Sequence, residues 1–183
     1  MAVKIAFYES PDPTGDGVKH FHARAVERET IRMDRLSHFV THRCTVSESD
    51  ILAVLTALSD VMVDAFLEAG FNYFDTAHGY LGGKSELALR ETLTSRYPRD
   101  RYILTNKLSG NFFEKEEDIR VCFEDQLRCC GVDYFDFYLM HAQNRRNYEK
   151  YKACRAYETA FALKEEGKVR HVGISFHDSA DIL

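Results

Sequence analysis

The chain has 183 residues, which is enough for one or two domains with a hydrophobic core. It is 45% apolar and contains only three prolines, a composition typical of folded proteins rather than disordered ones. Its net charge of -5 gives no support for electrostatic nucleic-acid binding by the chain as a whole. Because no apolar run reaches the roughly 18 residues that a membrane-spanning helix needs, we expect no membrane partner.

The cysteines and the first residues of the chain predict a cytoplasmic protein. Five cysteines, an odd number without the spacing of a disulfide framework, indicate free thiols in a reducing compartment. The first ten residues lack the long apolar stretch of a signal peptide. Ligand-like spacings occur among a few N-terminal side chains, but such spacings are common by chance, and we expect no metal site. These side chains are His20, His22, His38, His42 and Cys44.

The first third of the chain predicts two strands and a short helix. Alternating apolar and polar residues favour a strand over 3–8, and turn-forming residues favour a loop over 10–17. A second strand is expected over 21–26 and a helix over 30–41. One face of this helix would carry Met33, Leu36, Phe39 and Val40.

The strongest helical signal in the chain lies over residues 50–68. Ser47, followed by an acid three residues later at Asp50, resembles a capping box. Apolar residues recur with helical spacing through the segment, and Gly70 provides a stop signal. The apolar residues are Ile51, Val54, Leu55, Leu58, Val61, Met62, Ala65 and Phe66.

After Gly70, short strands alternate with helices. The strands are expected over 71–74, 102–105, 135–140 and 169–174, and the helices over 85–95, 116–130 and 151–166. Strands separated by helices of about ten or more residues indicate βαβ units and a parallel sheet. The apolar character of the strands predicts that the sheet is buried on both faces.

Four polar residues end or follow three of these strands: Asp75, Tyr80, Lys107 and His141. The carboxyl ends of parallel strands meet at one edge, where barrel enzymes keep their chemistry. A lysine ammonium makes a neighbouring tyrosine a better acid, a carboxylate holds a lysine, and a histidine can donate a hydrogen bond to a carbonyl oxygen. The pattern therefore predicts a site that polarises a carbonyl and delivers a proton as hydride arrives from a cofactor.

Each of the four residues also has a structural interpretation. Asp75 can serve as a helix cap, Tyr80 as a packed aromatic, Lys107 as a solvated charge and His141 as a buried histidine. The order of all four at successive strand ends favours the catalytic interpretation.

The segments GFNYFDTAHGY, ILTNK, DYFDFYLMHAQN and GKVRHVGISFH resemble the aldo/keto reductases. The resemblance covers roughly residues 62–183. It implies an eight-stranded βα barrel that reduces carbonyl compounds with NADPH or NADH. It further implies that Tyr80 is the proton donor, Lys107 modulates its acidity, Asp75 partners Lys107, and His141 orients the substrate.

The same resemblance suggests cofactor contacts. Ser175 matches the serine that commonly contacts the nicotinamide carboxamide. The next position, often asparagine in the family, is Phe176 here. Asn144, just beyond His141, is a further candidate for contact with the cofactor or substrate.

The chain supplies about the second to the fifth strand of the family's barrel. We therefore expect an α/β fold in the form of a partial TIM-like barrel with about four parallel strands. The later strands normally carry the loops that hold the cofactor's adenosine phosphate, so we expect impaired activity.

The N-terminal segment, from FYESPDPTGDGVKHFHARAVERET to SESDILAVLTALSDVM, resembles histone-like bacterial DNA-binding proteins of the HU type with an added N-terminal strand. Such proteins pair two helices as a dimer core and bind DNA with a following β-arm. The resemblance implies a homodimer through these helices. It ends at about Val63, before the arm.

We therefore expect a small α+β, HU-like domain over residues 1–63 and a partial reductase barrel over 64–183. The leading functional hypothesis is an aldo/keto reductase-like oxidoreductase acting on a small-molecule carbonyl with NADPH or NADH. One alternative is an HU-like DNA-binding module. Another is a non-functional chimera of two truncated domains.

Overall fold

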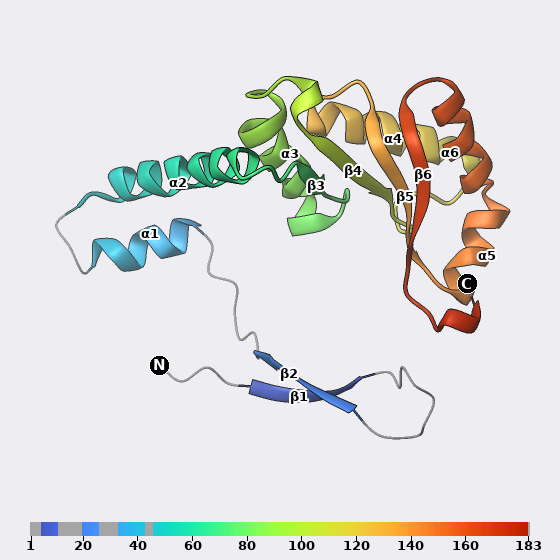
Figure 1. Cartoon of the computed structure of the whole chain (residues 1–183), viewed down its shortest axis with the longest axis horizontal. Coiled ribbons are helices and arrows are strands. Elements are labelled where there is room, and N and C mark those ends of the chain that lie inside the picture. The colour runs from blue at the N-terminus through green and yellow to red at the C-terminus, as the bar shows by residue number, and fades with distance from the viewer. Residues whose placement is uncertain (1–4, 11–19, 26–32, 43–45, 183) are drawn as a thin grey trace. The chain divides into compact units, whose positions relative to one another are not determined.

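The computed structural model describes residues 5–10, 20–25, 33–42 and 46–182 (Figure 1). The chain divides into two compact units, Met1–Thr56 and Ala57–Leu183. The domain boundary expected at residues 63 and 64 stays a prediction.

The first unit contains a hairpin and helical segments. Strand β1 (Ile5–Ser10) pairs antiparallel with β2 (His20–Ala25), in a register that sets Ile5 opposite Ala25. Both strands lie within two residues of their predicted bounds. Except for Ser10, which belongs to β1, the predicted loop over 10–17 lies outside the described residues.

Helix α1 (Met33–Thr41) and helix α2 (Glu48–Glu68) agree with the sequence pattern. The predicted cap of α2 is confirmed, because Ser47 Oγ accepts a hydrogen bond from Asp50 N at 3.2 Å. The first three residues of the helix expected over 30–41 lie outside the described residues. The apolar side chains of α1, Leu36, Phe39 and Val40, are exposed.

The second unit is built on a four-stranded parallel sheet in the order β3-β4-β5-β6. The strands are β3 (Tyr73–Asp75), β4 (Ile103–Leu108), β5 (Phe135–Gln143) and β6 (Val169–Phe176). Their register sets Thr105 beside both Asp75 and Phe137. The α/β architecture and the four parallel strands of a partial barrel are thereby confirmed.

Helices cover one face of this sheet, and Figure 1 shows α4 and α6 side by side against it. They are α3 (Lys84–Leu89), α4 (Glu116–Cys130), α5 (Arg145–Ala153) and α6 (Ala156–Glu165), and a turn of π-helix (Arg90–Thr94) extends α3. The core lies between α4 and the sheet. There Phe123 meets the rings of Phe135 and Tyr138 edge to face, at 5.6 and 5.0 Å between centroids.

Two expectations about this unit are corrected. The sheet is not buried on both faces: β4 and most of β5 are buried, but β6 is largely exposed or half-buried, since the described helices pack on one side. The single helix expected over 151–166 is instead two helices. Arg155, with a φ of 53°, separates α5 from α6 in a left-handed conformation.

A charged cluster joins three strands near their amino-terminal ends. Asp136 of β5 is buried and accepts hydrogen bonds from Leu104 N of β4 at 2.8 Å and from the Arg170 guanidinium of β6 at 2.9 Å. Arg99, just before β4, donates to the same carboxylate at 2.6 Å. The opposite, carboxyl end of the sheet carries the polar residues predicted from the sequence.

Within the described part of the chain, none of the helices has the length and apolar character needed to span a bilayer.

Candidate active site

The structure brings the four predicted catalytic side chains together at the carboxyl end of the sheet. Asp75 ends β3, Lys107 lies near the end of β4, and His141 lies near the end of β5. Tyr80 follows β3 in a short 3-10 turn, η1 (Tyr80–Gly83). Three strand ends and one turn therefore supply one cluster, as expected for a parallel α/β fold.

Lys107 is the centre of this cluster. Its ammonium group forms a salt bridge with Asp75 and donates a hydrogen bond to Thr76 O at 3.0 Å. It also donates to the Tyr80 hydroxyl at 3.3 Å, and it lies 4.7 Å from the centroid of the Tyr80 ring. Because Lys107 is only 5% exposed, these three oxygens hold a positive charge that has little contact with water.

His141 completes the cluster from β5. Its Nε2 lies 3.4 Å from the Tyr80 hydroxyl, and its Nδ1 lies 2.6 Å from the Ser109 hydroxyl. Burial lowers the pKa of His141, and electrostatic repulsion from Lys107 and His177 lowers it further. The imidazole is therefore neutral near pH 7, when one ring nitrogen carries a proton and the other accepts a hydrogen bond.

A pocket of about 430 Å³ opens beside Tyr80 and His141. Aromatic, amide and glycine groups make up much of its wall: Gly79, Ser109, Gly110, Asn111, Phe112, Asn147 and Tyr151. A Cβ on Gly110 would lie 3.3 Å from the Tyr151 ring, so the tight approach of these two segments favours glycine. Tyr80 and His141 can both donate a hydrogen bond to a carbonyl oxygen, and both face a cavity large enough for a small molecule.

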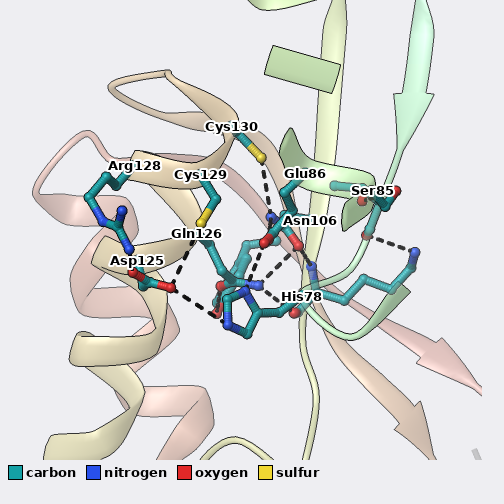
Figure 2. Close-up of polar contacts among 12 residues, drawn as sticks. His78, Ser85, Glu86, Asn106, Asp125, Gln126, Arg128, Cys129 and Cys130 are labelled. Atoms are coloured by element: carbon teal, nitrogen blue, oxygen red, sulfur yellow. Dashed lines mark hydrogen bonds and ion pairs between the residues drawn. The ribbon is translucent and has the colours of Figure 1, made fainter. Parts of the chain in front are cut away.

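Figure 2 shows a polar network that includes Glu86, Asn106 and Gln126. Asn106 and Gln126 connect this network to the peptide groups of Lys107. Glu86 of α3 accepts a hydrogen bond from Asn106 Nδ2 at 2.8 Å, and its other oxygen lies 2.8 Å from His78 Nδ1. Gln126 of α4 donates to Asn106 Oδ1 at 3.0 Å and accepts from the Tyr138 hydroxyl at 2.8 Å. Burial raises the pKa of Tyr138 well above its usual value, so this hydroxyl remains a donor.

This network takes the place of a neighbouring strand. Strand β3 ends at Asp75, and Thr76 N donates to Thr105 O at 2.9 Å. Alternate residues of a strand present their peptide groups to the same side. The peptide groups of Lys107 therefore point to the same side of β4 as those of Thr105, but β3 has already ended at this position. There Lys107 N donates to Asn106 Oδ1 at 2.8 Å, and Gln126 Nε2 donates to Lys107 O at 2.9 Å.

The site contains three further residues that the sequence pattern did not indicate: Asn106, Gln126 and Ser109. Asn106 precedes Lys107, and Gln126 is the polar residue on the otherwise apolar buried face of helix α4. A buried amide needs hydrogen-bond partners, so a polar residue in such a position is a usable signal.

The two residues predicted to contact the cofactor, Ser175 and Asn144, form hydrogen bonds within the protein. Ser175 Oγ accepts a hydrogen bond from Ala142 N at 3.1 Å, where Ala142 has a φ of 53° and β5 departs from regular register with β6. Asn144 is the N-cap of α5, and its side chain accepts from Asn147 N at 2.8 Å. Contact of either residue with a cofactor stays a prediction.

The described cysteines are free thiols: Cys122, Cys129, Cys130 and Cys154. Burial raises the pKa of Cys122 to about 12, so this thiol stays protonated near neutral pH. Among the residues that the structure describes, no group of three or more histidine, cysteine or acidic side chains is arranged to hold a metal ion.

Comparison with known proteins identifies the family of the chain. The model of the aldo/keto reductase family matches residues 50–183, which is most of the chain. A second model, described as an HU domain fused to a winged helix-turn-helix, Ig or glycine-rich motif, matches residues 1–72. Both resemblances inferred from the sequence are thereby confirmed, and the two matches overlap within and just beyond α2.

Individual relatives point to the same family. The NADH-specific methylglyoxal reductase of Escherichia coli is 30% identical over 67% of this chain and 43% of its own length. An aldo-keto reductase of Mycolicibacterium smegmatis is 32% identical over 62% of this chain and 39% of its own length. The chain therefore spans less than half the length of each of these relatives.

Solved structures agree as well. An aldo-keto reductase from Klebsiella pneumoniae, in complex with NADPH, is 26% identical with a TM-score of 0.55, over 67% of this chain and 40% of that one. An aldo/keto reductase from Brucella melitensis is 28% identical with a TM-score of 0.53, over 67% and 46%. The chain belongs to the aldo/keto reductase family.

Proposed function

We propose that this member of the aldo/keto reductase family reduces the carbonyl group of a small molecule with NADPH or NADH. The observation that carries the proposal is the contact of Lys107 with both Asp75 and Tyr80, at the edge of a pocket that His141 also faces. One reductase of Escherichia coli that resembles this chain is NADH-specific, and a similar Klebsiella pneumoniae structure contains NADPH.

Tyr80 is the proton donor in this proposal. Its oxygen accepts a hydrogen bond from Lys107 Nζ, so its own hydrogen can point toward a carbonyl oxygen in the pocket. The nearby ammonium stabilises the phenolate that remains after proton transfer, and Asp75 keeps the ammonium in place. His141 lies close enough to the same hydroxyl to orient the carbonyl oxygen with a second hydrogen bond.

The residues present also fit a nicotinamide group. A serine hydroxyl carries one donor and two acceptor sites, and Ser175 uses an acceptor site for Ala142 N. Its hydrogen therefore remains available to a carboxamide oxygen. When bound, the cofactor supplies the hydride.

The proposal predicts that Tyr80→Phe abolishes reduction. The phenylalanine keeps the ring that packs beside Lys107 and His141 but has no proton to donate. We expect kcat to fall by about 10²- to 10⁴-fold, because general acid catalysis contributes effects of that size. The measurement is the oxidation of NADPH and NADH, followed by absorbance, with a panel of small aldehydes, ketones and dicarbonyls.

Cofactor binding is the matched control for this variant. Titration of NADPH with protein, followed by the fluorescence of the nicotinamide itself, should give the same dissociation constant for the wild type and Tyr80→Phe. Full activity in the variant would reject the proton-donor role. Absence of both binding and turnover in the wild type would instead favour the non-functional chimera.

The match of residues 1–72 to an HU-type family favours DNA binding as a second candidate function. Binding through phosphate contacts weakens steeply as salt rises. Fluorescence anisotropy of a labelled duplex at several salt concentrations tests it, and size-exclusion chromatography with light scattering tests the predicted homodimer. No binding at low salt would reject the candidate.

A further inference from the structure

The short contact between Ser109 and His141 is not explained by the reaction proposed above. Ser109 follows β4 directly, two residues beyond Lys107, and is nearly buried. Its hydroxyl lies 2.6 Å from His141 Nδ1, the ring nitrogen on the other side from Tyr80. Within the described part of the chain, Ser109 is the one hydrogen-bond partner of this nitrogen.

We propose that Ser109 is a positioning residue that donates its hydroxyl hydrogen to His141 Nδ1 and thereby fixes the proton of the imidazole on Nε2. A neutral imidazole carries one N–H, and the partner of one nitrogen decides which form is present. This assignment is supported by the hydrogen bond that Nε2 has to donate on the pocket side of the ring.

On the pocket side, Nε2 has to be a donor. The Tyr80 oxygen already accepts from Lys107 Nζ, and in the proposed reaction its hydrogen points to the substrate oxygen. For His141 to donate a hydrogen bond to the substrate oxygen as well, Nε2 must carry the proton, which leaves Nδ1 as an acceptor. Ser109 supplies the donor that an acceptor in that place requires. This part of the inference rests on the proposed function.

The side chain of Tyr151 helps to hold Ser109 and His141 next to each other. The buried Tyr151 hydroxyl lies 2.6 Å from Leu108 O, next to Ser109, and 3.2 Å from the carbonyl oxygen of His141 itself. Gly110 lies against the same tyrosine ring. One side chain from α5 therefore joins the ends of β4 and β5 where the serine and the histidine meet.

The charges that face the imidazole favour its neutral form, in which the tautomer matters. Lys107 from β4 and His177 after β6 oppose protonation, and Asp75 from β3 favours it less strongly. Tyr80 faces Nε2 from the 3-10 turn. With the ring neutral, a single hydroxyl is sufficient to select one tautomer.

Nitrogen-15 NMR of protein labelled at histidine tests the inference in the full chain. His141 is assigned as the signal that disappears in His141→Gln, and its two ring-nitrogen shifts report the tautomer. We expect the Nε2–H form in the wild type, a mixture of both forms in Ser109→Ala, and a return to Nε2–H in Ser109→Thr. An Nδ1–H form in the wild type, or an unchanged tautomer in Ser109→Ala, would overturn the inference.

Kinetics give a second readout. We expect kcat to fall about tenfold in Ser109→Ala and to recover in Ser109→Thr, with an unchanged KM for NADPH, because only a proton position is altered. Ser95→Ala, at an exposed serine whose hydroxyl donates to Glu91 O, is the control and should behave as the wild type. An equal kcat in Ser109→Ala and wild type would also overturn it.

The two hypotheses fail in different ways. If the wild type reduces no carbonyl compound, the proposed function fails, but the NMR spectra still decide which nitrogen of His141 is protonated and whether Ser109 controls it. If the wild type is active and the tautomer does not respond to Ser109, the function stands and this inference fails.

Discussion

Lys107 and Tyr80 lie in contact, but the structure holds them in different ways. Lys107 is on a buried strand, and its peptide groups are bonded by the amides of Asn106 and Gln126. Tyr80 is 39% exposed and begins a short turn in which Leu81, Gly82 and Gly83 all have positive φ angles. Lys107 is therefore held on a buried strand, whereas Tyr80, the proposed proton donor, lies on an exposed turn.

This difference indicates how the site divides positioning from chemistry. A charge that must stay in place without much water needs a buried, fully bonded support. A group that must approach a substrate oxygen can lie on a turn at the surface, where access matters more. The following predictions break one side of this comparison or the other.

The largest effect among them is expected on the buried side, from Lys107→Met. Methionine fills similar space but removes the ammonium that stabilises the phenolate form of Tyr80. We expect kcat to fall by about 10²-fold and the alkaline limb of the pH–rate profile to move to higher pH. Lys164→Met, on an exposed face of α6, is the control. An unchanged profile would count against coupling between Lys107 and Tyr80.

Glu86→Ala should destabilise the support without touching the pocket. The change leaves Asn106 Nδ2 and His78 Nδ1 without the carboxylate that they contact. We expect the free energy of unfolding in urea to fall by about 2–3 kcal/mol, the cost of leaving buried polar groups unpaired. Glu86→Gln keeps an acceptor of the same shape and should lose much less. Equal losses in the two variants would mean that packing, not hydrogen bonding, matters at this position.

Gly83→Ala tests the turn that carries Tyr80. Gly83 has a φ of 84°, and an added Cβ would meet only His78 O, at 3.9 Å, so the cost is conformational strain rather than a clash. We expect a loss of about 1 kcal/mol in the free energy of unfolding. Gly79→Ala is the matched control, because Gly79 has a φ of -88°, where alanine is unstrained. The same loss in both would reject strain as the cause.

The smallest effect is expected from His141, as a dependence of stability on pH. Its pKa is lower in the folded protein than the ordinary value of 6.5, so the unfolded chain binds more protons between the two values. The free energy of unfolding should therefore fall as pH falls from about 6.5 toward the folded value, and this loss should level off below it. Urea titrations between about pH 7.5 and 5 should show this slope in the wild type and a weaker one in His141→Gln. Equal slopes would reject the shift.

The sequence predicted those parts of the fold that depend on local pattern. Helix α4 has the predicted bounds because its apolar spacing and the stop at Gly131 are contained within the segment. The break between α5 and α6 was missed because Arg155 is neither glycine nor proline, so nothing local marks its left-handed conformation. The exposure of β6 was not predicted. An apolar run indicates that a strand tends to be buried, but it does not show whether another element packs against each face of the strand.

The candidate site divides in the same way. Asp75, Lys107 and His141 could be predicted because each lies at or near the end of an apolar run, and parallel strands bring such ends together. The partners of these residues could not. Gln126 reaches Lys107 only because α4 lies over β4, and Ser109 reaches His141 only because β4 and β5 are neighbours.

The charged cluster around Asp136 has a consequence for how this protein can change over generations. It joins three strands at the end of the sheet opposite the pocket, so part of the alignment of the strands rests on residues that do not line the pocket. Substitutions among pocket residues such as Asn111 and Phe112 can then alter which molecules are accepted while the sheet still assembles. Separating the two ends makes the fold evolvable, because selection can explore new substrates at one end without losing foldability at the other.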